Sequence, residues 1–119
     1  MHVLGELEKS QPPPPTIVWE TLSDPRKPNA RQWLTLNDDE VEPQIIDSVR
    51  PSLVIWSSLW PDRPNDRIRF TIASDGGEGT NLKWSLESPD LPLDDDRLAR
   101  IRHRINYLIN GEMRYSFGQ

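Results

Sequence analysis

The chain has 119 residues, the length of one domain, and contains no cysteine, so disulfides, thiolate metal sites and cysteine nucleophiles are excluded. Its net charge of −5 argues against broad binding of nucleic acids, since affinity for phosphate backbones rests on Lys and Arg. Residues 1–10 lack the apolar run of a secretion signal, and no stretch approaches the roughly 18 apolar residues of a membrane span. We therefore expect a single cytoplasmic domain over residues 1–119, with no membrane span and no nucleic-acid partner.

The first part of the chain predicts a strand followed by a short helix. In residues 2–9 the side chains alternate with the period of two that is typical of a strand. The prolines at 12–15 form a rigid connector, whose last member suits the first turn of a helix. Residues 16–22 are then expected to be helical. Asp24 and Pro25 end this helix, because the residue before a proline avoids the helical region.

A second short helix is expected over about residues 29–36, with Asn29 as its N-cap and Trp33 inside it. An acidic cluster follows this helix, and we interpret it as a solvated loop. The cluster consists of Asp38, Asp39, Glu40 and Glu42.

The middle of the chain predicts an antiparallel sheet. Strands are expected over residues 44–49, 53–60 and 67–73, with proline-containing turns between them. Residues 75–79 are rich in glycine, which supplies the positive φ angles of a hairpin turn. On both sides of this turn apolar and polar residues alternate, as in strands with one face in water. The apolar positions are Ile68, Phe70, Ile72, Leu82, Trp84 and Leu86.

Residues 94–115 predict a long amphipathic helix. The aspartates at 94–96 can cap its start and complement its dipole. At about 1.5 Å per residue the helix is roughly 33 Å long, which is enough to cross a small sheet. Its apolar side chains fall on one stripe at helical spacing. They are Leu98, Ile101, Ile105, Leu108 and Ile109.

Two charged residues, Glu112 and Arg102, lie on or beside this stripe. A charge on the core side of a helix is costly unless it is paired or hydrated. Either both side chains look into an internal cavity, or Glu112 lies beyond the edge of the sheet and Arg102 extends its charged end to water. The other basic residues of the helix form either an ordinary solvated face or an RNA-binding patch. They are Arg97, Arg100, His103, Arg104 and Arg114.

Patterns for catalysis and metal binding are scarce. With two histidines, a zinc site would need carboxylates in unusual numbers, so no metal and no cofactor are expected. No spacing predicts a catalytic set, although Glu112 could act as an acid or base if it faced a cavity. Trp56, Phe70 and Trp84 occupy inward positions of the expected sheet. They either form plain core or line a pocket for a flat or apolar ligand.

Four segments, in this order along the chain, carry a family resemblance. They are residues 16–25 (TIVWETLSDP), Trp33-Leu34, residues 50–56 (RPSLVIW) and residues 70–82 (FTIASDGGEGTNL). They resemble the first helix, the tryptophan of the second helix, the turn into a central strand and the Gly-Thr hairpin of the START-like superfamily. That superfamily includes polyketide cyclases, Bet v 1-like proteins and Hsp90-ATPase-activator-like proteins. The resemblance covers about residues 3–115.

The resemblance implies an α+β helix-grip fold, in which a bent antiparallel sheet wraps around a long C-terminal helix, with two short helices after the first strand. The chain departs from the superfamily pattern at one place. Between Trp33 and Gln44 the superfamily usually has additional strand, whereas this chain has the acidic loop. The sheet is therefore expected to be short by about one hairpin, which bears on the size of any cavity.

The superfamily binds hydrophobic small molecules between its sheet and its C-terminal helix. Some members cyclise or dehydrate polyketides, and others act on protein partners such as chaperones. The resemblance therefore implies a non-catalytic site for a lipid- or polyketide-like molecule. The alternatives are a cyclase- or hydrolase-like enzyme with the same cavity and a protein-interaction module. The expected ligand-binding residues are Trp56, Phe70, Trp84, Arg102, Ile105, Ile109 and Glu112.

Overall fold

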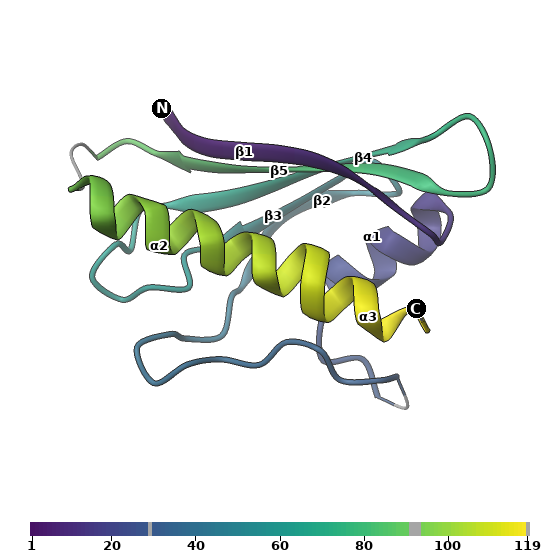
Figure 1. Cartoon of the computed structure of the whole chain (residues 1–119), viewed down its shortest axis with the longest axis horizontal. Coiled ribbons are helices and arrows are strands. Elements are labelled where there is room, and N and C mark those ends of the chain that lie inside the picture. Colours follow the sequence, from purple (N-terminus) through teal and green to yellow (C-terminus); the bar gives the residue numbers. More distant parts are fainter. Residues whose placement is uncertain (29, 91–93, 119) are drawn as a thin grey trace.

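A computed structural model describes residues 1–28, 30–90 and 94–118. In these residues it shows an antiparallel sheet of five strands, with a long helix running along one face (Figure 1). A shorter helix, α1 (Pro15–Ser23), packs against β3 and β4. The strands are β1 (His2–Gln11), β2 (Ile45–Val49), β3 (Leu53–Ser57), β4 (Arg67–Ser74) and β5 (Thr80–Ser88).

The strand order is β1-β5-β4-β3-β2, so β2 to β5 pair as consecutive hairpins and β1 lies beside β5 at one edge. Alternation places the apolar residues of neighbouring strands opposite one another. Phe70 pairs with Trp84 on one side and Val54 on the other, and all three are buried. The turn between β4 and β5 contains Gly76 at φ 90°, a conformation that glycine adopts without steric cost. The predicted antiparallel sheet and its glycine hairpin are confirmed.

Strand β3 ends at Ser57, earlier than predicted. The hydroxyl of Ser58 accepts a hydrogen bond from the backbone N–H of Trp60 (3.0 Å) and donates one to the Trp60 carbonyl oxygen (3.1 Å). Local bonds of this kind compete with the strand ladder and turn the chain away from it. Leu59 and Trp60 are nevertheless buried, so this apolar stretch contributes to the core from a loop.

The long C-terminal helix consists of α2 (Asp95–Asn106), the wider segment η1 (Tyr107–Met113) and α3 (Arg114–Ser116). The carboxylate of Asp94 accepts a hydrogen bond from the backbone N–H of Arg97 at 2.7 Å, which caps the start of the helix as predicted. The predicted apolar stripe is confirmed as the side that packs on the sheet. Its buried members are Ile101, Ile105, Leu108 and Ile109, and Leu98 packs against them.

The segment η1 changes which residues face the sheet near the end of the helix. It is a π-helix, whose hydrogen bonds join residues five apart, so each turn holds one residue more than an α-helical turn. Regular helical spacing would direct Glu112 toward the core, but Met113 is fully buried there instead. Glu112 is turned to the flank of the helix. There its carboxylate accepts a hydrogen bond from the hydroxyl of Tyr107 at 2.6 Å.

The second short helix is absent from the described residues, so that prediction is wrong. Asn29, its expected N-cap, lies outside the described residues, and residues 30–36 form an irregular loop. Trp33 and Leu34 are neighbours in sequence and both are buried. The ring of Trp33 stacks on that of Trp56 in the core, with 6.1 Å between the ring centroids. These tertiary contacts outweigh the local preference for a helix.

The acidic loop runs on the opposite side of the long helix from β1 (Figure 1). Asp38, Asp39 and Glu42 are exposed, as expected of a solvated loop. Glu40 is not, because 1% of its side chain is exposed and it forms an ion pair with Arg104 at 2.8 Å. The prediction of a solvated loop is therefore wrong at Glu40, which is buried because the helix supplies a cation to it.

Candidate functional site

Five of the seven predicted ligand-binding residues lie together in the core between the sheet and the long helix. They are Trp56, Phe70, Trp84, Ile105 and Ile109, and none is more than 2% exposed. The ring of Phe70 meets that of Trp56 edge-on, with the centroids 4.8 Å apart. Since these side chains pack in one cluster, access to them depends on the pockets at the flanks of the helix.

Arg102 and Glu112 lie outside this cluster. Arg102 is exposed, and the aliphatic part of its side chain crosses β1 at Gly5. A Cβ atom at Gly5 would lie 2.5 Å from Cδ of Arg102, so a larger residue there would displace the Arg102 side chain. The charged end of Arg102 extends beyond the core to water. Glu112 is directed away from the core by η1 and bonds to Tyr107.

The indole N–H of Trp84 is buried and has no hydrogen-bond partner among the described residues. Most buried polar groups are paired, and an unpaired one costs roughly 1–3 kcal/mol. The neighbouring Trp56 follows this rule, because its indole donates to the carbonyl oxygen of Leu22 at 2.8 Å. Trp84 therefore offers a free donor in the core to an acceptor atom of a bound molecule.

A first pocket, which we call the Trp33 pocket, lies between α1, the loop that follows it and the C-terminal end of the long helix. Its volume is about 390 Å³. Its lining carries charges of both signs, from Glu20 and Asp24 and from Lys27 and Arg31. Arg31 also lies over the ring of Tyr115, 4.4 Å from the centroid. The apolar lining comes from Ile17, Pro25, Pro28, Ala30, Trp33 and Phe117.

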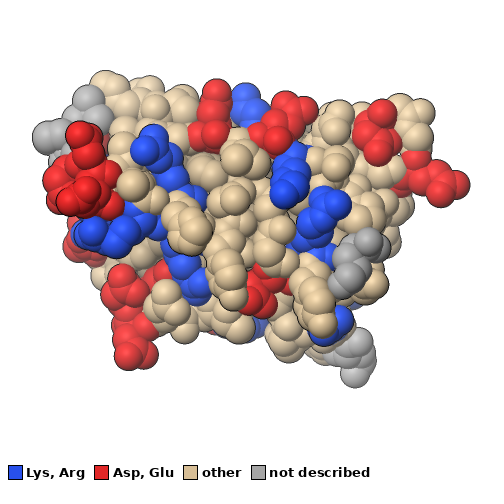
Figure 2. Space-filling view, in the orientation of Figure 1, with Lys and Arg blue, Asp and Glu red and all other residues tan. Residues whose placement is uncertain are grey.

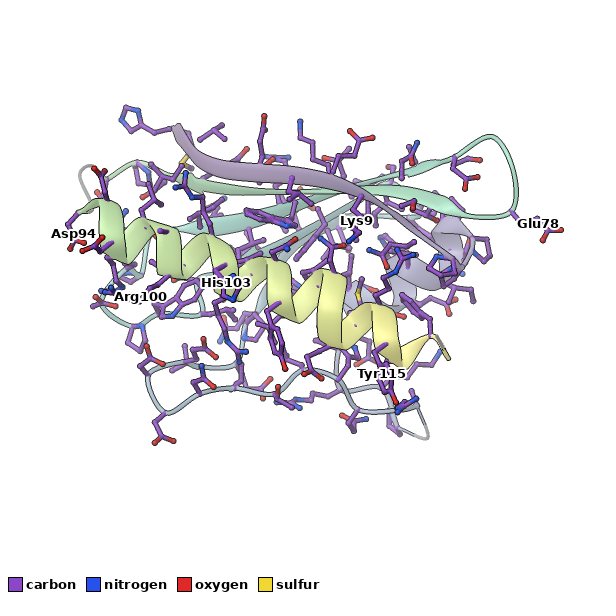
Figure 3. All side chains as sticks on the ribbon, in the orientation of Figure 1. Lys9, Glu78, Asp94, Arg100, His103 and Tyr115 are labelled. Atoms are coloured by element: carbon purple, nitrogen blue, oxygen red, sulfur yellow. The ribbon has the colours of Figure 1, made fainter. Side chains whose placement is uncertain are left out.

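A second pocket, which we call the Trp60 pocket, lies between α2 and the loop that carries the acidic cluster. Its volume is about 560 Å³, within the range of roughly 300–1,000 Å³ that is usual for small-molecule sites. The buried side chains of Trp60 and Ile101 form its apolar floor, and Tyr107 lies toward the end of α2. Arg100 and His103, both on α2, complete its outer rim (Figure 3).

Two arginines that line the Trp60 pocket are already paired with carboxylates. Arg97 donates two hydrogen bonds to Asp62, at 2.8 and 2.9 Å, and this guanidinium holds the pKa of the Asp62 carboxyl below its ordinary value. Arg104 likewise donates two bonds to Glu40, at 2.8 and 2.9 Å, which raise the pKa of Arg104. By contrast, Arg100 has neither a hydrogen-bond nor an ion-pair partner among the described residues.

The hydroxyl of Tyr107 lies at the edge of this pocket, and its hydrogen bond to Glu112 raises the pKa of the phenol above its ordinary value of 10.0. Loss of the phenolic proton would place two negative charges side by side, which opposes ionisation. We expect Glu112→Gln to lower the pKa of Tyr107. In a Tyr115→Phe background Tyr107 is the one remaining tyrosine, so ultraviolet absorbance against pH follows it alone.

Glu78→Gln is the control for this experiment, because Glu78 is exposed in the β4–β5 turn, which projects away from the long helix (Figure 3). It should leave the titration of Tyr107 unchanged. Identical curves for Glu112→Gln and the parent protein would contradict the hydrogen bond.

The face of the molecule shown in Figure 2 is mixed in charge. In Figure 2, Lys and Arg form separate groups with uncharged or acidic side chains between them, an arrangement typical of an ordinary solvated surface. Among the described residues there is no group of three or more side chains that could hold a metal ion. Nor is any helix in the described part of the chain long and apolar enough to cross a membrane.

Sequence reasoning missed most of both pockets. Arg104 was assigned to the outer face, and no pattern in the sequence indicated that its side chain reaches the buried Glu40. Trp60 was assigned to a strand, whereas it lies in the floor of a pocket. No local pattern marked the loop residues that close the pockets against the helix.

No protein-family model matches the chain, and no curated protein matches it. Solved structures do match. CalU16 from Micromonospora echinospora has a TM-score of 0.65 and 14% identity, over 89% of this chain and 71% of that one. The Aha1 dimer from Colwellia psychrerythraea has a TM-score of 0.60 and 10% identity, over 87% and 88% of the two chains. Ara h 8.0201 has a TM-score of 0.57 and 16% identity, over 97% of each chain. At these identities the similarity is one of fold.

Proposed function

We propose, from the START-like helix-grip fold that the chain shares with these structures, that it binds a small hydrophobic, lipid- or polyketide-like molecule without catalysing a reaction on it. The superfamily that the sequence resembles holds such molecules between the sheet and the C-terminal helix. In this chain the proposed entrance is the Trp33 pocket. From there the ligand would reach the aromatic side chains that the sequence analysis singled out.

The observation that carries this proposal is the continuity between the Trp33 pocket and the aromatic core. Trp33 lines the pocket and stacks on Trp56, which in turn meets Phe70 edge-on. An apolar molecule in the pocket would rest against Trp33, behind which Trp56 and Phe70 pack, and would remove apolar surface from water. Burial of apolar surface contributes roughly 25 cal/mol per Å².

A polar anchor inside the core supports the same proposal. Glu112, which the sequence suggested for this role, faces the flank of the helix. The unpaired indole N–H of Trp84 remains as a donor that a carbonyl or hydroxyl oxygen of a ligand could satisfy. Such a bond would remove the cost of leaving the donor unpaired. We therefore propose Trp84, with Trp56 and Phe70, as ligand-binding residues.

The enzymatic alternative depends on an acid or base that faces the ligand. Glu112 does not occupy that position. Two carboxylates line the Trp33 pocket: Glu20 is engaged by Arg50 at 3.0 Å and Lys27 at 3.5 Å, and Asp24 is exposed. These placements favour a binding protein over a cyclase or hydrolase.

The protein-interaction alternative is favoured by one feature of the edge strand β2. All of its residues are exposed, and three of them are large and apolar, namely Ile45, Ile46 and Val49. Exposed apolar edge strands can pair with another chain. This alternative predicts a complex formed along β2, whereas small-molecule binding predicts none.

A neutral apolar dye such as N-phenylnaphthylamine tests the proposed function. We expect saturable binding, detected as dye fluorescence and as quenching of tryptophan emission. Ile17 is 42% exposed at the pocket. Ile17→Lys should weaken the affinity about tenfold, because it removes an apolar contact and adds a charge that must keep its water.

Val49→Lys is the matched control, since Val49 is also an exposed apolar residue but lies on β2 and does not line the pocket. It should leave the affinity unchanged. Absence of saturable binding across a panel of apolar dyes and fatty acids, or equal effects of the two variants, would contradict the proposal.

A further inference from the structure

We propose that the Trp60 pocket is a second binding site, and that it takes a flat aromatic molecule carrying one carboxylate. In this site Arg100 would bind the carboxylate, and Trp60 and Ile101 would contact the aromatic body. The site lies between α2 and the acidic loop, apart from the Trp33 pocket. It therefore does not depend on the function proposed above.

The shape of the pocket suits such a molecule. Its floor is apolar, since it is formed by the side chains of Trp60 and Ile101, which are 4% and 2% exposed. Tyr107, which is about half exposed, adds a second aromatic side chain. Aromatic rings favour offset-stacked or edge-on contacts with flat molecules. The floor and Tyr107 together favour an aromatic ligand over a flexible aliphatic one.

Arg100 supplies the positive charge that a ligand in this pocket could use. Its neighbours on the helix, Arg97 and Arg104, each donate two hydrogen bonds to a carboxylate of the protein. Arg100 lies one helical turn from both and has no such partner in the described parts of the chain. A planar guanidinium with free donors matches the geometry of a carboxylate, with which it can form two parallel hydrogen bonds.

Two further side chains affect how many negative charges the ligand can carry. His103, one turn after Arg100 on the rim, can donate a hydrogen bond to the same anion. Asp39, which also lines the pocket, repels it, although Arg97 lies close enough to offset part of that charge. A singly charged carboxylate therefore fits better than a doubly charged phosphate.

The pocket is held in place by contacts within the protein. The guanidinium of Arg104 bonds to Glu40 and also to the carbonyl oxygen of Thr35, so the loop is fixed against α2. The turn made by Ser58 sets the backbone of Trp60. A site whose walls are fixed before binding loses less conformational entropy when the ligand arrives.

Naphthoate is a suitable probe, and neutral naphthamide of the same shape is its comparison. The indole N–H signals of the tryptophans in a ¹H–¹⁵N spectrum report where each compound binds, once single Trp→Phe variants have assigned them. We expect naphthoate to shift the signal of Trp60 and to leave that of Trp33 in place. Naphthamide should bind at least about tenfold more weakly, because the charge-assisted pair of hydrogen bonds between Arg100 and the carboxylate is lost.

Two substitutions in the pocket should act in opposite directions. Arg100→Gln should weaken naphthoate binding about tenfold, and Asp39→Asn should strengthen it severalfold, because one removes the attractive charge and the other the repulsive one. Arg67→Gln makes the same change as Arg100→Gln at an exposed position of β4 outside the pocket. It should have no effect beyond experimental error.

Equal affinities for naphthoate and naphthamide would overturn the proposal, as would equal effects of Arg100→Gln and Arg67→Gln. A shift confined to Trp33 would place the probe in the other pocket and would also overturn it. Failure of apolar dyes at the Trp33 pocket would leave these results unaffected. The two proposals can therefore fail separately.

Discussion

Ile105→Ala is expected to destabilise the protein by about 2–5 kcal/mol, the range for truncation of a large buried aliphatic side chain. Ile105 is 1% exposed and belongs to the same core cluster as Trp56, Phe70 and Trp84. Removal of its outer carbons would leave a cavity that the packed sheet and helix can fill only in part. Urea unfolding followed by tryptophan fluorescence gives the free energy of unfolding.

Arg100→Ala, at an exposed position of the same helix, is the control. Its free energy of unfolding should change by less than about 0.5 kcal/mol, as is usual for surface substitutions. A loss below that value for Ile105→Ala would mean that the apolar stripe does not pack on the sheet as described.

Arg104→Met is expected to destabilise the protein by about 3 kcal/mol, because it leaves the carboxylate of Glu40 buried without its cation. The side chains of Arg104 and Glu40 are 15% and 1% exposed. The substitution also removes the bond from Arg104 to the carbonyl oxygen of Thr35. The double variant Glu40→Met with Arg104→Met should recover much of the loss, since apolar replacement of both partners leaves no buried charge.

Arg97→Met is the matched control, because Arg97 is on the same helix and also forms two bonds to a carboxylate. Its partner Asp62 is 59% exposed, so the pair should contribute less than about 1 kcal/mol. If chemical unfolding gave Arg104→Met and Arg97→Met the same stability, burial of the Glu40 pair would not matter to the fold.

Elements with regular alternation were predictable because their pattern and their packing agree. The apolar residues of β4 and β5 occur at every second position, and they are buried. The aspartates before α2 cap it, and the stripe from Leu98 to Ile109 packs on the sheet. The resemblance to the START-like superfamily, which rested on four short segments, is confirmed at the level of the fold by the similar structures.

The acidic loop and the missing second helix were not predictable from local sequence, because their structure depends on distant partners. Trp33 is held by Trp56, and Glu40 is held by Arg104, 64 residues away in the chain. A helical propensity or a count of charges contains no information about such partners. The same reason explains why the Trp60 pocket, which forms between a loop and a helix, was not identified from the sequence.

The candidate site was predicted in part. Trp56, Phe70, Trp84, Ile105 and Ile109 do come together in the core, since periodicity was enough to place them on facing surfaces. Their role in ligand binding stays a prediction.

The segment η1 also affects how this helix can be aligned with the corresponding helix of proteins that have a similar fold. Residues before Tyr107 and after Met113 follow two helical phases that differ by one residue. Alignment with an uninterrupted helix therefore needs a one-residue gap inside the helix, where gaps are normally penalised most. Without that gap, Glu112 would be matched to a buried apolar residue and Met113 to a residue on the flank, which lowers the apparent similarity over the last turns of the chain.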